Sequence, residues 1–402
     1  EQVDARLDVL TVARDQVPRQ LPVARATIVR QHLHEIPGEG VDADRGDGAW
    51  QPEEVEVTRE DVARHLGEIN VEVVLTAHPT EAKRPVILKQ HRAIYEMLQQ
   101  SALPHWTPRE REALRERLKV QLEQLWRTGE MYLYKPDVAS ELNVVLDYFR
   151  MVFPHAVLAL DQRLRDTWKL AGYDPALLRG PETLPRVTFG DWVGGDRDGH
   201  PLVTAQVTRE TLSKLRNSAR ALLAERLDSL YNALSLSDLY QETPASLHGA
   251  IEAKKALLGS VSAGIVAANP REPWRQLVRL MKACLSDESV PTAARYQRPE
   301  ELFADLGVLQ DALAAVGAHR LAEAEVAPVA RLTKIFGFHT AALDVRQNSA
   351  FYEAALLELL AAGGVEAKDY ASWDEDQRFA FLCEELRTLR PLAPRGAPLG
   401  QK

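Results

Sequence analysis

Val71-Glu-Val-Val-Leu-Thr-Ala77 leads directly into His78-Pro-Thr-Glu81, and this change from an apolar run to a polar cluster decides the fold prediction. The run is apolar and rich in β-branched residues, which is typical of a buried strand. Pro79 disfavours a helical backbone at His78, while a helix that begins just after it would direct free amide groups toward the histidine. The segment therefore predicts a strand, a turn at His78, and a helix.

Two further segments repeat this layout. Arg186–Trp192 and Phe338–Val345 are short strand-like runs in a chain that is otherwise dominated by helical periodicity. Each run delivers a polar cluster at its carboxyl end, which is where α/β proteins place their chemistry. We therefore predict a mostly α-helical protein with a few parallel strands. Three strands are too few to close a barrel by themselves.

Leucine stripes at helical spacing predict long helices with core-forming faces. One stripe comprises Leu114, Leu118, Leu122 and Leu125, and a second comprises Leu212, Leu215, Leu222, Leu223, Leu227, Leu230 and Leu234. Thr58 and Asp61 have the spacing of a capping box, which predicts a helix start. Asn348 or Ser349 can cap a helix over Ala350–Ala362 that a glycine pair ends.

The first polar cluster combines His78 with the cations Lys83 and Arg84. An imidazole beside a helix amino terminus and two cations can bind an anion and transfer a proton. A lone histidine more often fixes such a turn structurally. The surrounding residues favour the functional interpretation here.

The second cluster, Phe189-Gly-Asp-Trp-Val-Gly-Gly-Asp-Arg-Asp-Gly-His-Pro201, is rich in glycine and charge. Its loop residues are Gly194, Gly195, Asp196, Arg197, Asp198 and Gly199. The glycines permit positive φ and a close approach of the backbone. The arginine stands where a calcium loop needs an oxygen ligand, which argues against calcium. A rigid turn whose charges hold only its own shape remains an equal alternative.

The third cluster, Leu343-Asp-Val-Arg-Gln-Asn-Ser349, places Arg346 where a strand gives way to a helix. A guanidinium can hold a phosphate or a carboxylate through two parallel hydrogen bonds. The alternative is an ordinary salt bridge to Asp344 or to a neighbouring helix.

Composition narrows the functional classes. The net charge of −9 argues against nucleic acid as the main partner. No stretch reads as the roughly 18 apolar residues of a membrane helix, and the start does not read as a secretory signal. The two cysteines, Cys284 and Cys383, are far apart in the sequence, so we expect buried, reduced thiols and a cytoplasmic protein.

Known cofactor motifs are not found. His32 and His34 have no further zinc ligand at a convincing spacing. The sequence also has no phosphate-binding P-loop, no dinucleotide fingerprint after a strand and no nucleophile elbow.

Together, the three clusters resemble the signature motifs of phosphoenolpyruvate carboxylases. Leu75–Glu81 is similar to the family's histidine motif, Phe189–Pro201 to its Gly-Gly-Asp-Arg-Asp-Gly loop, and Leu343–Gln347 to its arginine motif. The order is the same, and weaker similarity extends over most of the chain from about residue 60. Lys83 departs from the family's usual pair of arginines, which weakens any paired anion contact there.

The resemblance implies an architecture. Residues 58–392 would be the helix-rich amino-terminal part of a heavily helix-decorated (β/α)8 TIM-type barrel that is incomplete in this chain. Residues 1–57 would be an amino-terminal helical segment and loop, and residues 393–402 a linker or truncation tail. The missing carboxyl-terminal half would supply the rest of the barrel.

The resemblance also implies a lyase that carboxylates phosphoenolpyruvate with bicarbonate, giving oxaloacetate and phosphate for the tricarboxylic acid cycle. His78 would be catalytic and Arg346, Arg84 and Arg197 would bind substrate, with the other residues of the glycine loop in support. The family's Mg²⁺ or Mn²⁺ ligands belong to the missing half, so no metal ligand is assigned here and we expect no activity from this chain alone. A cytoplasmic, allosteric homotetramer without nucleic-acid or membrane partners is also implied.

Three other hypotheses stay open from the sequence. The chain can be a binding or regulatory fragment that kept the fold without catalysis. It can be a phosphotransfer protein in which His78 itself is phosphorylated. A helical scaffold without a ligand fits least well, because three strands end in polar clusters.

Overall fold

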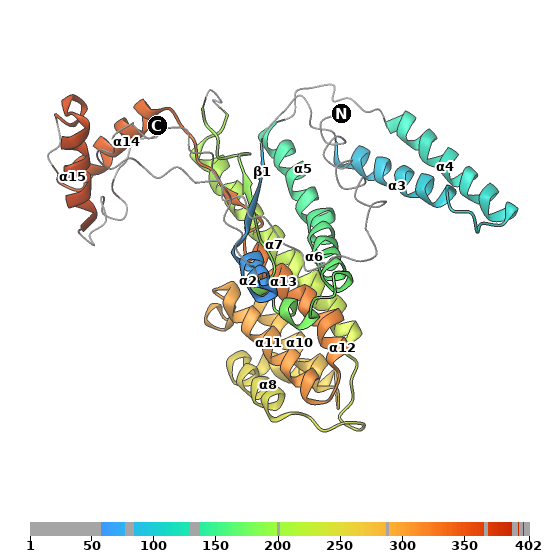
Figure 1. Ribbon diagram of the computed structural model, residues 1–402. Helices are drawn as coiled ribbons and strands as arrows, with labels where there is room; N and C mark the ends of the chain where they lie inside the picture. Colours follow the sequence, from blue (N-terminus) through green and yellow to red (C-terminus); the bar gives the residue numbers. More distant parts are fainter. Residues whose placement is uncertain are drawn as a thin grey trace, which may run out of the picture. The chain divides into compact units, whose positions relative to one another are not determined.

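The computed structural model describes residues 58–76, 84–128, 137–198, 202–286, 289–365 and 369–387, together with Ala393 and Ala397. The described elements are mostly helices, with one small sheet (Figure 1). They fall into two units. One contains 58–69 with 167–185, and the other contains 70–166 and the residues from 186 onward.

The smaller unit is built around α2 (Arg59–Glu68). The predicted capping box is confirmed, because the Asp61 amide donates to the Thr58 hydroxyl at 3.1 Å and Asp61 Oδ2 accepts from the Thr58 amide at 3.3 Å. Two 3-10 turns, η2 (Pro175–Leu178) and η3 (Pro181–Thr183), pack against this helix and bury Leu178.

The sheet of the larger unit has three parallel strands in the order β1 (Asn70–Leu75), β2 (Arg186–Asp191) and β3 (Ala342–Leu343). Asn70 pairs with Arg186 at one end of the β1–β2 ladder, and Leu75 pairs with Asp191 at the other. The prediction of a mostly helical chain with a few parallel strands is therefore confirmed.

The third strand is much shorter than predicted. Pairing is limited to Ala342 and Leu343, whereas the sequence predicted Phe338–Val345. Gly337 has φ of +51°, and the chain turns after it. Phe338 and Ala341 are buried in the core outside the ladder, so their apolar character reflects packing rather than strand pairing.

Helices form the rest of the larger unit's core. They are α5 (Val138–Met151), α6 (Phe153–Leu170), α7 (Ala205–Ala233), α8 (Ala245–Leu258), α9 (Ser260–Ala267), α10 (Pro273–Ser286), α11 (Pro299–Ala315), α12 (His319–Leu321), the π-helical turn η5 (Ala322–Val326) and α13 (Ala327–Phe336). The long helix α7 packs against α5, α10 and α13 (Figure 1). It is the common support for these elements.

Leucines of the predicted α7 stripe fill this core, including Leu215, Leu223 and Leu227, whose side chains are fully buried. Leu212 is 42% exposed, so its assignment to the core face was wrong. Four aromatic rings at Phe149, Phe153, Phe189 and Phe336 contact one another and join α5, α6, β2 and α13. This cluster fixes β2 against the helices.

Four further helices complete the described chain. They are α3 (Pro85–Ser101), α4 (Pro108–Thr128), α14 (Ser349–Ala362) and α15 (Glu375–Arg387), with the 3-10 turn η4 (Thr292–Ala294) before α11 and η6 (Tyr370–Ser372) before α15. Asn348 caps α14 as predicted, since its Oδ1 accepts from the Ala350 amide at 2.9 Å. On α4 only Leu114 is buried and Leu122 is 48% exposed, so the prediction of a continuous core face was wrong there.

One described segment, Val138–Leu170, is long and apolar enough to cross a membrane by length and composition. This is a weak indication, because a core helix of a soluble protein passes the same test. The segment consists of α5 and α6, and Leu142 and Phe149 on it belong to the main core. Of the two thiols, Cys284 is buried as predicted, whereas Cys383 is only half-buried because α15 packs on one side.

Candidate functional site

The carboxyl ends of the three strands meet at one edge of the sheet. Leu75, Asp191 and Leu343 stand in one row of the ladder. The row is continued by backbone hydrogen bonds from the Trp192 amide to the Leu75 carbonyl, at 3.0 Å, and from the Asp344 amide to the Asp191 carbonyl, at 2.9 Å. The polar residues that follow β2 and β3 are therefore brought together although about 150 positions separate them in the sequence.

Two glycines allow the loop after β2 to lie against its neighbours. Gly194 has φ of +82°, and a Cβ there would overlap the Thr211 hydroxyl on α7. A Cβ at Gly195 would overlap the carbonyl oxygen of Asp344. A larger residue at Gly194 would have to displace the Thr211 side chain, and one at Gly195 would have to displace the Asp344 backbone.

Arg346 is anchored by this loop through its backbone. Its amide donates to the Gly195 carbonyl at 3.2 Å, and its carbonyl accepts from the Arg197 amide at 2.8 Å. Asp196 and Arg346 form an isolated parallel bridge. The loops after β2 and β3 are thus locked to each other.

The Arg346 side chain is 48% exposed. Its guanidinium lies over the Trp192 ring, 4.3 Å from the centroid, and Nη1 is 3.9 Å from Asp196 Oδ2. The alternative of a salt bridge to Asp344 is wrong, because Asp344 Oδ2 instead accepts from Trp192 Nε1 at 2.9 Å. A long, half-exposed ion pair contributes little, so the guanidinium keeps hydrogen-bonding capacity for an anion.

The other charges of the glycine loop mainly hold its shape. Asp196 Oδ1 accepts from the Asp198 amide at 3.1 Å. Arg197 Nη2 donates to the Thr208 hydroxyl at 3.2 Å, and that hydroxyl donates to the Gly194 carbonyl at 2.8 Å. Arg197 therefore ties the loop to α7, whereas Arg346 is the arginine that stands beside an aromatic ring at the row of strand ends.

Of the remaining predicted site residues, the structure describes Arg84 but not His78 or Gly199. Arg84 is at the start of α3, and its Nη2 donates to the Thr128 carbonyl at the end of α4, at 2.5 Å. This recorded contact is to a helix end rather than to the loops after β2 and β3. His78 and Gly199 lie outside the described residues.

Sequence reasoning missed Asp191, the last residue of β2. It is fully buried, and its Oδ1 accepts from the Val193 amide at 3.0 Å, while Oδ2 has no hydrogen-bond partner within the described residues. Burial, and to a lesser extent the negative charge of Asp344, raises the pKa of this carboxyl to about 7. A carboxylate inside an apolar run was the available signal.

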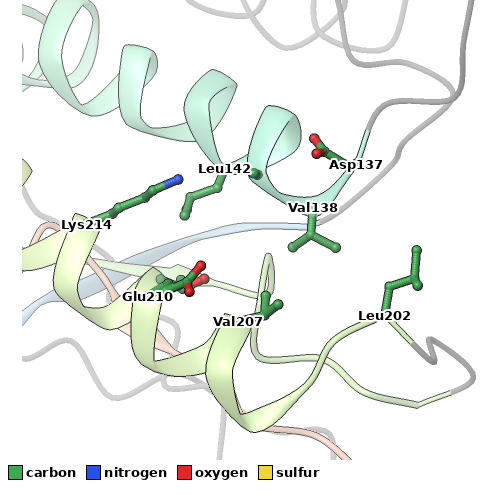
Figure 2. A pocket seen from close by; sticks show the side chains of 9 residues that line it. Asp137, Val138, Leu142, Leu202, Val207, Glu210 and Lys214 are labelled. Carbon is green, nitrogen blue, oxygen red and sulfur yellow. The ribbon is translucent and has the colours of Figure 1, made fainter.

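A cavity of about 170 Å³ lies behind the glycine loop, between the amino-terminal ends of α5 and α7. Figure 2 shows Glu210 and Lys214 on α7 and Asp137 at the start of α5. Asp137 is already engaged, because its Oδ1 accepts from the Ser140 amide at 2.8 Å. Thr211 lines the cavity, and its side chain also packs against Gly194. The cavity therefore lies next to the contact between α7 and the glycine loop.

Within the part of the chain that the structure describes, no three His, Cys, Asp or Glu side chains are grouped as a metal site would require. The arrangement at the strand ends is instead suited to hold an oxyanion. Arg346 supplies the hydrogen-bond donors, and the Trp192 ring limits where its guanidinium can lie.

Comparison with known proteins gives a consistent match. Residues 50–402 match the family model described as phosphoenolpyruvate carboxylase. The chain is similar to proteins named phosphoenolpyruvate carboxylase from Chromobacterium violaceum, with 34% identity over 81% of this chain and 36% of the relative, and from Mycobacterium leprae, with 32% identity over 82% and 35%. A third, from Ectopseudomonas mendocina, is 34% identical over 83% and 36%. The chain thus spans about a third of the length of these relatives.

Proposed function

Because the chain belongs to the phosphoenolpyruvate carboxylase family, we propose that it forms the amino-terminal part of an enzyme that carboxylates phosphoenolpyruvate with bicarbonate. The products are oxaloacetate and phosphate, and the reaction replenishes the tricarboxylic acid cycle. The strongest support is Arg346, half-exposed on the Trp192 ring at the carboxyl ends of three parallel strands. This is where an anionic substrate can be held by a preorganised guanidinium.

Each predicted residue receives a proposed role. His78 moves protons during formation and use of the carboxylating intermediate, and Arg346 holds the substrate phosphate. Arg84 and Arg197 add positive charge at the same site, although their recorded contacts, with Thr128 and Thr208, favour a positioning role. Gly194, Gly195, Asp196, Asp198 and Gly199 support the loop that carries Arg346.

The remaining parts of the site are proposed to come from the rest of the protein. Mg²⁺ or Mn²⁺ assists the reaction when bound, and its ligands lie in the part of the family's chain that this sequence does not cover. The three parallel strands form one section of a (β/α)8 barrel. We expect a cytoplasmic homotetramer under allosteric control, with no nucleic-acid or membrane partner.

A coupled oxaloacetate assay tests the proposal on the whole gene product that carries this sequence, with bicarbonate and Mg²⁺. His78→Asn is expected to lower kcat by about 10²–10⁴-fold, the usual contribution of a positioned proton-transfer group. Arg346→Gln should raise KM for phosphoenolpyruvate by about tenfold or more, because it removes a charge-assisted phosphate contact. The 402-residue chain alone should be inactive.

Arg209→Gln is the matched control, since Arg209 is an exposed arginine on α7 with no recorded side-chain contact to the loops after β2 and β3 within the described residues. It should leave both constants unchanged. Absence of oxaloacetate from the whole product would refute the reaction. Full activity of His78→Asn would refute the catalytic role of His78 but would not affect the assignment of the chain to the family. Mass spectrometry after incubation with phosphoenolpyruvate separates phosphotransfer, which alone leaves a covalent phosphohistidine.

A further inference from the structure

Asp191 contacts both loops of the candidate site. It is the last residue of β2, and its backbone carbonyl accepts from the Asp344 amide at 2.9 Å. Its side-chain Oδ1 accepts from the Val193 amide at 3.0 Å, two residues further on, which is the hydrogen bond of an Asx turn. Asp191 therefore fixes the start of the glycine loop through its side chain and the loop after β3 through its backbone.

Arg346 depends on the same two loops. Its guanidinium lies over the Trp192 ring, and Trp192 Nε1 donates to Asp344 Oδ2 at 2.9 Å. The Trp192 carbonyl accepts from the Gly195 amide at 3.0 Å, and the Gly195 carbonyl accepts from the Arg346 amide at 3.2 Å. A displacement of Asp191 is therefore transmitted to the guanidinium both through the ring and through the backbone.

The surroundings of the Asp191 carboxyl suit its neutral form. The residue is fully buried, and Oδ2 has no hydrogen-bond partner within the described residues. Burying an ionised carboxylate without a cation is costly. Burial, and to a lesser extent the charge of Asp344, accordingly raises the pKa of Asp191 to about 7. Its charge therefore changes near neutral pH.

Charged side chains on the elements around β2 do not offset that carboxylate within the described residues. On β1, the exposed Glu72 points to the opposite face of the sheet, because side chains alternate along a strand and Leu75 is paired with Asp191. On α13, which packs against β2, Arg331 is held in a buried ion pair and Lys334 is exposed. The charge recorded to act on Asp191 comes from an acidic residue in the loop after β3.

We propose that Asp191 is a positioning residue for Arg346, which in its neutral form holds the Trp192 ring in place and on ionisation weakens oxyanion binding at Arg346. This inference rests on the proposed function, in which Arg346 holds the substrate phosphate. Ionisation acts in two ways. It adds a negative charge at the edge of the sheet where the anion binds, and it favours any movement of the glycine loop that lets water reach the buried carboxylate.

Fluorine NMR of the 402-residue chain labelled with 5-fluorotryptophan tests this coupling without any assay of activity. Trp192→Phe identifies the Trp192 resonance. In the wild type this resonance should titrate with a midpoint near pH 7. In Asp191→Asn, which keeps the Oδ1 acceptor and cannot ionise, it should stay constant over the same range. Glu72→Gln removes an exposed carboxylate from the neighbouring strand and should titrate as the wild type does.

Kinetics of the whole gene product test the consequence for substrate binding. The KM for phosphoenolpyruvate of the wild type, divided by that of Asp191→Asn, should be close to one at pH 6 and about threefold or more at pH 8. This ratio cancels the titration of the substrate, which is the same for both proteins. Asp191→Ala, which also loses the acceptor for the Val193 amide, should raise KM at both pH values. Glu72→Gln should match the wild type at both.

Separate outcomes decide the inference and the proposed function. The role of Asp191 is refuted if the Trp192 resonance does not titrate in the wild type, if it titrates equally in Asp191→Asn, or if the KM ratio is the same at both pH values. A whole gene product that makes no oxaloacetate refutes the proposed function instead. The fluorine titration then still decides whether ionisation of Asp191 moves the Trp192 ring.

Discussion

Asp191 shows how one residue couples the candidate site to pH. Its pKa is raised from 3.8 to about 7 by burial, so between these values the native state holds more protons than the unfolded state. The free energy of unfolding therefore falls as pH rises through this window, and the penalty is complete above about pH 7. The ionised carboxylate has no recorded cation partner within the described residues to offset its burial.

Asp191→Asn should remove this penalty. Urea unfolding should show a variant more stable than wild type by up to about 4 kcal/mol at pH 8, and equal to it within about 1 kcal/mol at pH 4. Asp198→Asn, an exposed change in the same loop, should show no such dependence. Equal stability of Asp191→Asn and wild type at pH 8 would mean that the carboxyl is solvated or paired.

Glycine-to-alanine substitutions should change stability in opposite directions in the glycine loop and in α11. Gly194→Ala should destabilise by about 2 kcal/mol or more, because of its positive φ and its overlap with Thr211. Gly307→Ala, in the interior of α11 with open space around it, should stabilise by about 1 kcal/mol. Urea denaturation measures both, and a harmless Gly194→Ala would show that the loop is not tied to α7.

The sequence reached some residues of the site and not others, for physical reasons. The positions of Arg346 and the glycines followed from motifs and from local backbone rules. The partner of Arg346 did not, because Trp192 and Asp196 are about 150 positions away and meet it only through the β2–β3 register. The role of Asp191 needed knowledge of burial, which its neighbours alone do not determine.

At the scale of elements, α6 and α13 are joined by a buried ion pair. Arg331 Nε is 2.8 Å from Asp161 Oδ2, Nη2 is 3.2 Å from Oδ1, and both side chains are less than a tenth exposed. Removing Asp161 deprives the buried Arg331 guanidinium of the carboxylate that it contacts through two hydrogen bonds, so Asp161→Ala should cost about 3–5 kcal/mol in urea unfolding. Glu123→Ala, which breaks an exposed pair with Arg127 on α4, should cost less than about 1 kcal/mol.

Replacing both partners, as in Asp161→Leu with Arg331→Met, should restore much of that loss, because neither charge is then buried alone. If the single Asp161→Ala variant costs no more than Glu123→Ala, the pair is accessible to water and does not join the helices.

Some element boundaries could be predicted from local sequence, whereas others depended on tertiary packing. Caps at Thr58 and Asn348 were predicted because a side chain and a nearby amide determine them locally. The length of β3 was not, because Phe338 and Ala341 are apolar for the helical core rather than for a ladder. The exposure of the leucine stripe on α4 was not predicted, because periodicity identifies an apolar stripe but not whether another element packs against it.

At the scale of the whole molecule, β1 carries apolar side chains on both faces that stay partly exposed among the described residues. Val71, Val73 and Val74 are 48%, 38% and 41% exposed, and β1 pairs with β2 alone within the described residues. An apolar edge strand is a template for association with another chain. The chain covers only about a third of each of these relatives, so residues of the longer family members can cover this edge.

The 402-residue chain should therefore self-associate at micromolar concentrations, and Val73→Lys should reduce this, because a charge on an edge strand opposes pairing. Sedimentation velocity measures the shift toward monomer. Val120→Lys is the matched control: Val120 is 61% exposed on α4, where the helix has already satisfied its backbone hydrogen bonds. If both variants act alike, general hydrophobicity drives association. If Val73→Lys alone acts, the open edge of β1 is the surface that the longer family members must cover.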